Sequence, residues 1–180
     1  MTIFLIILSV LLWAGALWCL YGRQTIAPAL SYLAMFSLSF VSENGLRILP
    51  LNTTILTGWL VMTLAVMCSA ALQPEPVRRQ TRGMTFFIGG ALVGLALGLL
   101  GFSIGSDLSL RYGLMILSTA AGTALGFLLY TNTPDGNAIK PGSGHFVRYL
   151  LAKGFPTAIT IMQLGVVLVL LIALYNVNAL

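Results

Sequence analysis

A long apolar stretch crowded with glycine, residues 83–105, constrains this chain more than any other feature. It reads GMTFFIGGALVGLALGLLGFSIG and carries no charge. A helix crosses the hydrocarbon core of a bilayer with about 20 apolar residues, so the stretch is long enough to span a membrane. In water each interior glycine would weaken a helix by roughly 0.5–1 kcal/mol relative to alanine. In lipid the backbone must hydrogen-bond to itself, so the helix persists. We therefore predict that this stretch is the central, protein-facing helix of a membrane bundle.

The glycines of this stretch recur mostly at four-residue spacing, which leaves one helix face almost without side chains. Such a face is typical of a surface that a second helix approaches closely. A further apolar stretch, residues 112–129, follows after a very short connection and carries glycines of its own. We predict that the two stretches form a tight antiparallel hairpin. The expected helix-packing residues are Gly90, Gly94, Gly98, Gly101, Gly105, Gly122 and Gly126.

The composition places the rest of the chain in lipid as well. Hydrophobic residues make up 58% of the chain and charged residues 7%, whereas a soluble domain carries about 25% charged residues. The apolar runs are long and do not alternate, so they favour helices over a transmembrane barrel. The sequence predicts an all-α, polytopic transmembrane helix bundle of one domain with about six spans. The expected spans are residues 2–20, 26–41, 53–72, 83–105, 112–129 and 157–175, with a cytoplasmic loop at 131–156.

The basic residues predict an orientation. With six spans, the loops on one side hold seven of the nine basic residues, and the other side holds Arg47 and Arg111. The positive-inside rule places the seven in the cytoplasm and both termini outside. We expect a bacterial inner (plasma) membrane protein whose net charge of +5 lies on the cytoplasmic face. Such a face attracts anionic lipid headgroups at about 1 kcal/mol per residue, and no nucleic acid is expected. The candidate headgroup contacts are Arg78, Arg79, Arg82, His145, Arg148 and Lys153.

Two loops on the opposite side share the pattern Ser-acid-x-x-Leu-Arg, at residues 42–47 and 106–111. They could belong to related repeats, from which transporters are often built. They could equally be unrelated acid–Arg pairs at helix ends. If the loops lie side by side, their charges form a candidate outer polar cluster that binds a polar solute or headgroup. The alternative is surface ion pairs worth about 0–1 kcal/mol each. The residues concerned are Glu43, Arg47, Asp107 and Arg111.

Few residues could carry chemistry. His145 is the only histidine, which excludes bis-histidine haem ligation within the chain and disfavours a zinc site. No charged residue or histidine is placed clearly at mid-membrane, where ion-coupled carriers need one. We predict no catalytic residue, no metal site and no cofactor. Cys19 and Cys68 are expected to be small buried hydrophobes, although a bridge between them stays open.

Two further expectations concern the helix faces. The second half of the last span, GVVLVLLIALY, has almost no polar atoms and is expected to face lipid. A few polar residues within the spans are expected to hydrogen-bond across helices, and the alternative is that they line a path. These residues are Ser118, Thr119, Thr123 and Gln163.

Three functions remain open. The first is a non-catalytic membrane component, a scaffold or subunit whose glycine helix packs against its own copy or other membrane subunits. The second is a small transporter or channel for a neutral or weakly polar solute. The third is a lipid-active enzyme at the cytoplasmic interface that uses His145, Arg148 and Lys153. No resemblance to a known family is identified.

Overall fold

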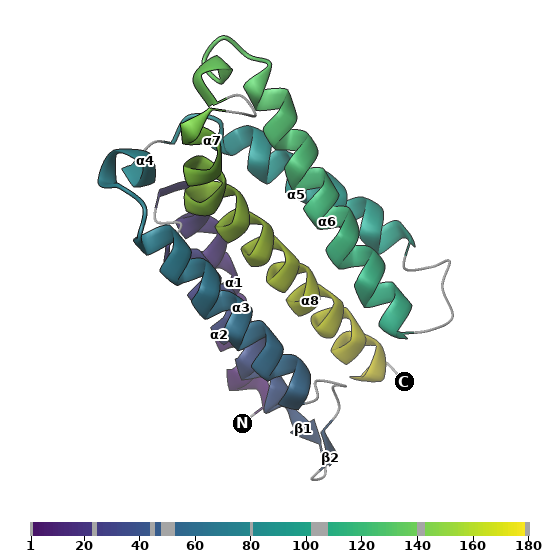
Figure 1. Cartoon of the computed structure of the whole chain (residues 1–180). Coiled ribbons are helices and arrows are strands. Elements are labelled where there is room, and N and C mark those ends of the chain that lie inside the picture. Colours follow the sequence, from purple (N-terminus) through teal and green to yellow (C-terminus); the bar gives the residue numbers. More distant parts are fainter. Residues whose placement is uncertain are drawn as a thin grey trace.

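The computed structural model describes residues 2–22, 25–43, 46–47, 53–79, 81–101, 108–139 and 143–178 (Figure 1). Helices dominate the described part of the chain. The α-helices are α1 (Thr2–Gly22), α2 (Ala27–Ser39), α3 (Thr53–Ala71), α4 (Glu75–Arg79), α5 (Met84–Gly101), α6 (Leu108–Thr131), α7 (Gly144–Tyr149) and α8 (Phe155–Asn178). A 3-10 turn η1 (Asn137–Ile139), a π-helical turn η2 (Leu150–Gly154) and one antiparallel pair of two-residue strands, β1 (Ser42–Glu43) and β2 (Leu46–Arg47), complete the order.

Four stretches are long and apolar enough to cross a membrane. They lie in α1, in α3, in α6 and in the continuous stretch from α7 into α8. Helices α2 and α5 are apolar but shorter, with 13 and 18 residues. The apolar helices indicate an integral membrane protein, and whether all six cross the bilayer remains a prediction.

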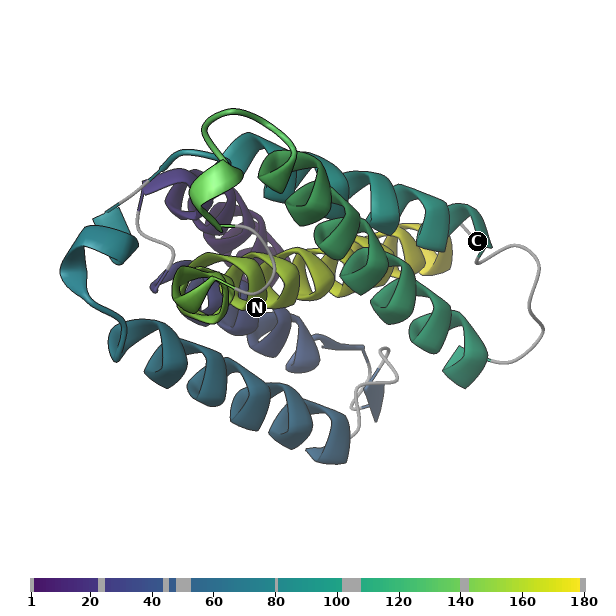
Figure 2. The ribbon, with the colours of Figure 1, turned by 45° about the horizontal axis from the view of Figure 1, so that its top comes forward.

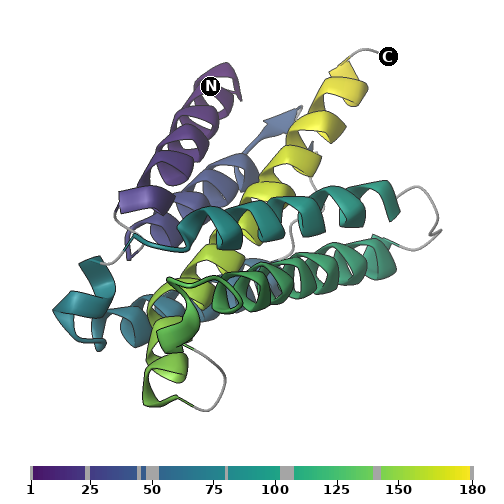
Figure 3. The same ribbon diagram turned by 90° about the horizontal axis from the view of Figure 1, so that it is seen from above.

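Helix α8 lies between two groups of helices (Figures 1 and 2). Helices α5 and α6 pack along each other on one side of α8, and α1, α2 and α3 lie on the other. Seen from above, α8 passes obliquely across α5 (Figure 3). Helix α4, η1 and α7 lie at one end of the bundle. The strands β1 and β2, the beginning of α1 and the end of α8 lie at the other.

The central helix is α8, so the prediction that the glycine-rich helix is central was wrong. In the most apolar part of the α7–α8 stretch, 72% of the residues are buried. The corresponding shares in α1, α3 and α6 are 17%, 22% and 33%. The expectation that the second half of this helix faces lipid was also wrong, because Val167 and Leu170 are at most 1% exposed. Helix α5 instead exposes Val93, Leu97 and Leu100. An apolar side chain suits lipid and a helix interface equally, so hydropathy alone cannot separate the two.

The last span also begins earlier than the sequence indicates. A cytoplasmic loop was expected at residues 131–156, followed by a span starting at 157. The structure instead joins α7 to α8 through η2. Pro156 lacks the N–H that an α-helix needs. In the turn before it, the Phe155 N–H bonds to the Leu150 carbonyl at π-helical spacing, and this shifted register lets the helix continue into Pro156.

Candidate functional site

Helices α5 and α6 meet through glycine. A Cβ added at Gly90 would lie 2.3 Å from the Gly122 carbonyl oxygen, and one added at Gly94 would lie 2.2 Å from the Ser118 carbonyl oxygen. A Cβ at Gly126 would in turn meet the Phe86 carbonyl oxygen at 2.2 Å. These distances leave no room for a side chain, and the contacts run in opposite directions along the two helices. Gly101 ends α5, and Gly105 lies outside the described residues.

A buried amide joins α8 to two other helices. Gln163 is fully buried. Its Oε1 accepts a hydrogen bond from Ser31 Oγ of α2 at 2.5 Å, and its Nε2 donates to Thr63 Oγ1 of α3 at 2.7 Å. Ser31 and Thr63 are at most 3% exposed. The prediction that Gln163 bonds across helices is confirmed, and its two partners could not be identified from the sequence.

The other hydroxyl groups that were expected to bond across helices do not. Thr119 Oγ1 and Ser118 Oγ both donate to the Met115 carbonyl, and Thr123 Oγ1 donates to the Thr119 carbonyl. A Ser or Thr in a helix can always reach a carbonyl three or four residues earlier, so these groups need no partner on another helix. The expectation for these three residues was therefore wrong.

The candidate outer polar cluster cannot be assembled from the described residues. Asp107 lies outside them, and the side chains of Glu43, Arg47 and Arg111 are not described. The backbone structure, however, differs between the two loops that share a pattern. Glu43 and Arg47 belong to β1 and β2, whereas Arg111 lies in the first turns of α6. The repeated residues thus adopt different local structures, which weakens the repeat interpretation.

The candidate headgroup contacts divide into exposed and buried residues. Arg82, His145 and Arg148 are exposed, and they lie at the end of the bundle that carries α4 and α7 (Figure 1). Arg78 and Arg79 lie in α4, and their side chains are not described. Lys153 is only 2% exposed, so its assignment as a headgroup contact was wrong. It lies in η2, which packs against α3 and α4, and the enzyme hypothesis loses an accessible amine.

An aromatic cluster ties the segments at this end together. The Tyr149 hydroxyl donates to the Arg82 carbonyl, and the Tyr149 ring stacks with the Tyr130 ring at 6.2 Å between centroids. Gly83 has φ +83°, and an added Cβ would lie 2.6 Å from the Tyr130 ring. The segment before α5, the end of α6 and the start of the α8 stretch therefore hold one another. This cluster was not predicted, although its aromatic residues border the predicted loops.

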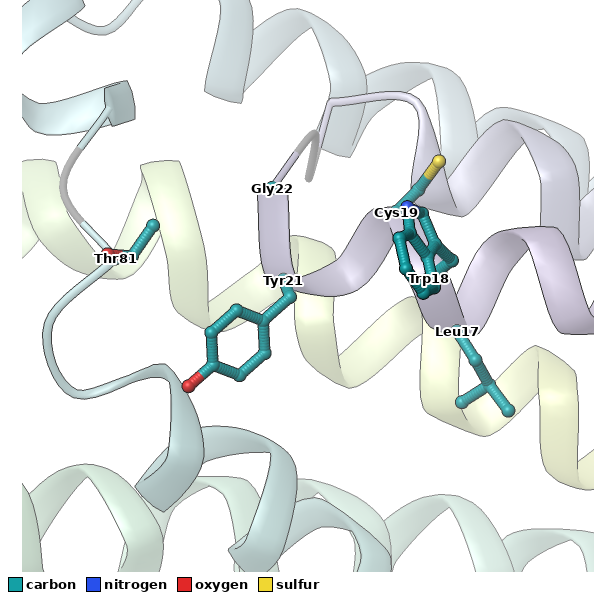
Figure 4. A pocket seen from close by; sticks show the side chains of 6 residues that line it. All are labelled: Leu17, Trp18, Cys19, Tyr21, Gly22 and Thr81. Atoms are coloured by element: carbon teal, nitrogen blue, oxygen red, sulfur yellow. The ribbon is translucent and has the colours of Figure 1, made fainter.

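An open pocket of about 920 Å³ lies beside α1 at this same end (Figure 4). Its described lining residues are Leu17, Trp18, Cys19, Tyr21, Gly22 and Thr81. Tyr21 extends from α1 toward the segment that carries Thr81, and Leu17 and Trp18 lie farther back along the helix (Figure 4). The Trp18 side chain is 84% exposed. The pocket thus combines an aromatic, apolar wall with two hydroxyl groups.

Two apolar grooves open on the sides of the bundle. One, of about 390 Å³, follows the outer face of the α5–α6 pair, with Gly89, Val93 and Leu125 in its lining. The other, of about 290 Å³, lies where α3, α6 and α8 meet, with Trp59, Ile116 and Met162 in its lining. A groove of either kind admits a helix or an acyl chain of the surrounding lipid.

The cysteines do not pair. Cys19 is half-buried and Cys68 is exposed, and both are free thiols. The expectation that both are buried hydrophobes fails for Cys68, whose position on α3 faces outward. Among the described residues, no group of three His, Cys, Asp or Glu side chains could hold a metal ion.

The chain matches no protein-family model, no curated protein and no solved structure.

Proposed function

We propose that the chain is a non-catalytic component of a bacterial inner-membrane complex, a scaffold or subunit with both termini outside. The observation that supports this function is the hydrogen bonding of the Gln163 side chain. A mobile or reactive polar group would need free hydrogen-bonding capacity, whereas the amide of Gln163 is bonded to both Ser31 and Thr63. This arrangement fixes three helices to one another, which suits a rigid body that other chains assemble on.

The groove on the outer face of the α5–α6 pair is the surface that we assign to a second copy or another subunit. Most of the glycines are already used between α5 and α6, but Gly89 is not. A Cβ added at Gly89 meets nothing within 4 Å, and Gly89 lines this groove. A membrane helix could lie against it with close backbone approach.

A single substitution tests this surface. Gly89→Leu fills the groove without touching the α5–α6 contact, so we expect it to reduce the assembled fraction on native gels while the melting temperature stays near wild type. Gly113→Leu is the control, because an added Cβ at Gly113 of α6 likewise meets nothing within 4 Å and Gly113 lies outside this groove. Equal assembly of wild type and Gly89→Leu would refute the groove assignment.

A small transporter or channel for a neutral solute is the second candidate. The observation that favours it is the position of the Gln163 cluster next to the α3–α6–α8 groove, since Met162 lines that groove. If these hydrogen bonds exchange with a solute, Gln163→Leu should abolish flux into proteoliposomes. Flux of a panel of neutral solutes that equals that of empty vesicles would remove this candidate.

A further inference from the structure

We propose that the pocket between the end of α1 and Thr81 is a specific site for one anionic phospholipid of the cytoplasmic leaflet. The proposal rests on the proposed membrane placement and orientation, but not on the subunit role. It replaces a diffuse attraction of headgroups to the basic end with one defined place.

The depth of the pocket fits a headgroup. It lies at the end of α1, and Thr81 comes just before the start of α5 at Met84. Trp and Tyr side chains prefer the membrane–water interface, and here Trp18 and Tyr21 both line the pocket while remaining 84% and 52% exposed. Two helix ends and two interfacial aromatic side chains therefore place the pocket at headgroup level.

The chemistry of the wall suits a whole lipid rather than an acyl chain alone. Leu17 and Trp18 continue the apolar surface of α1 toward the bilayer centre, where acyl chains would lie. Tyr21 and Thr81 also line the pocket, and each carries a hydroxyl group that can donate to a phosphate oxygen. The volume of about 920 Å³ falls within the range of ligand sites, about 300–1,000 Å³.

The charge around the pocket favours an anion. The exposed Arg82 directly follows Thr81. In the described part of this end, α4, the segment before α5 and α7 carry four arginines, against two acidic residues, Glu75 and Asp135; the arginines are Arg78, Arg79, Arg82 and Arg148. The end of the bundle that carries the pocket therefore has a positive formal charge, and a phosphatidylglycerol-type headgroup complements it better than a zwitterionic one.

Quenching of Trp18 fluorescence measures the occupant directly. The full chain is placed in phosphatidylcholine vesicles that contain a minor fraction of brominated phosphatidylglycerol or, in parallel, the same fraction of brominated phosphatidylcholine. Trp18→Phe supplies the background from the other tryptophans, so the difference reports Trp18 alone. We expect brominated phosphatidylglycerol to quench Trp18 more strongly, and equal quenching by the two lipids would overturn the proposal.

A matched pair of charge changes separates a site from diffuse attraction. Thr81→Glu puts a negative charge on the pocket wall, and Asn132→Glu puts the same charge on an exposed turn at the same end. We expect Thr81→Glu to weaken the preference for phosphatidylglycerol by about fivefold, which corresponds to about 1 kcal/mol, and Asn132→Glu to leave it within about twofold. Equal losses in both variants would show diffuse attraction only.

The milder variant Tyr21→Phe keeps the test decisive if Thr81→Glu fails to fold. It removes one hydroxyl from the pocket and leaves the aromatic wall. We expect a weakened preference with unchanged helix content. A preference equal to that of wild type in Tyr21→Phe would contradict the site. Neither outcome affects the assembly test at Gly89, so the lipid site and the subunit role can fail separately.

Discussion

Helices α5 and α6 contact each other through glycine backbone, whereas α2, α3 and α8 are joined by the side chain of one glutamine. The first contact requires that glycine has no side chain, since an added Cβ at Gly94 would lie 2.2 Å from the Ser118 carbonyl oxygen. The second requires the side-chain amide of Gln163, which makes two hydrogen bonds. In lipid, where apolar burial drives helix association little, close packing and interhelical hydrogen bonds are the two available means. In this chain α5 and α6 use close packing, and α2, α3 and α8 use interhelical hydrogen bonds.

The comparison predicts that the glycine contact tolerates change least. We expect Gly94→Leu to separate α5 from α6, because overpacking of a tight interface costs about 3 kcal/mol at the upper end of the usual range. Thermal unfolding in detergent measures the loss. Gly113→Leu, where an added Cβ meets nothing within 4 Å, should stay near wild type. A Gly94→Leu protein as stable as this control would show that α5 and α6 do not pack as described.

The glutamine contact should be weaker. Gln163→Leu keeps the side-chain size and removes both hydrogen bonds, each worth about 0.6 kcal/mol in a membrane bundle, so we expect a loss of about 1 kcal/mol. Ser31 Oγ lies 3.0 Å from the Pro28 carbonyl oxygen and Thr63 Oγ1 donates to the Trp59 carbonyl, so neither partner is left unbonded. Thr160→Ala, which removes only a bond to the Pro156 carbonyl of its own helix, is the control.

A double-mutant cycle sharpens this prediction. The stability losses of Gln163→Leu and Ser31→Ala should fall short of additivity in the double variant, because both remove the same hydrogen bond. Strict additivity would mean that Ser31 and Gln163 do not interact in the folded protein.

The smallest effect is expected at the aromatic cluster, outside both contacts. Tyr149→Phe removes the hydrogen bond to the Arg82 carbonyl. A neutral hydrogen bond contributes about 0.5–1.5 kcal/mol, and because this one lies at the end of the bundle we expect a loss near the lower figure. We expect faster hydrogen exchange in the segment before α5 with little change elsewhere. Tyr130→Phe is the matched variant, since it removes a neighbouring tyrosine hydroxyl and leaves the bond from Tyr149 to the Arg82 carbonyl in place. Equal exchange in the two variants would contradict the role assigned to Tyr149.

The sequence predicts the positions of the helices well, because long apolar runs and breakers define them. The third span, for example, was expected at residues 53–72 and α3 occupies Thr53–Ala71. The four-residue glycine spacing also predicts a helix-packing face, since small residues let two backbones approach closely. Which helix lies at the centre is not readable, because Val167 and Leu170 would suit lipid as well as they suit the bundle interior.

The candidate sites show the same limit. A lone glutamine in an apolar run indicates an interhelical hydrogen bond, but its partners Ser31 and Thr63 lie 132 and 100 residues away in the chain. Lys153 was expected at the surface because it is charged, and it is buried because η2 packs against α3 and α4. The pocket at Trp18 and Thr81 joins two distant segments, so no local pattern could show it.

The native mass of the gently solubilised wild-type chain, recorded beside that of Gly89→Leu, tests the proposed role most directly. The account predicts that the wild-type chain carries a second copy or another membrane subunit and that Gly89→Leu has lost it. A wild-type chain that is monomeric, as Gly89→Leu is, would contradict the subunit role.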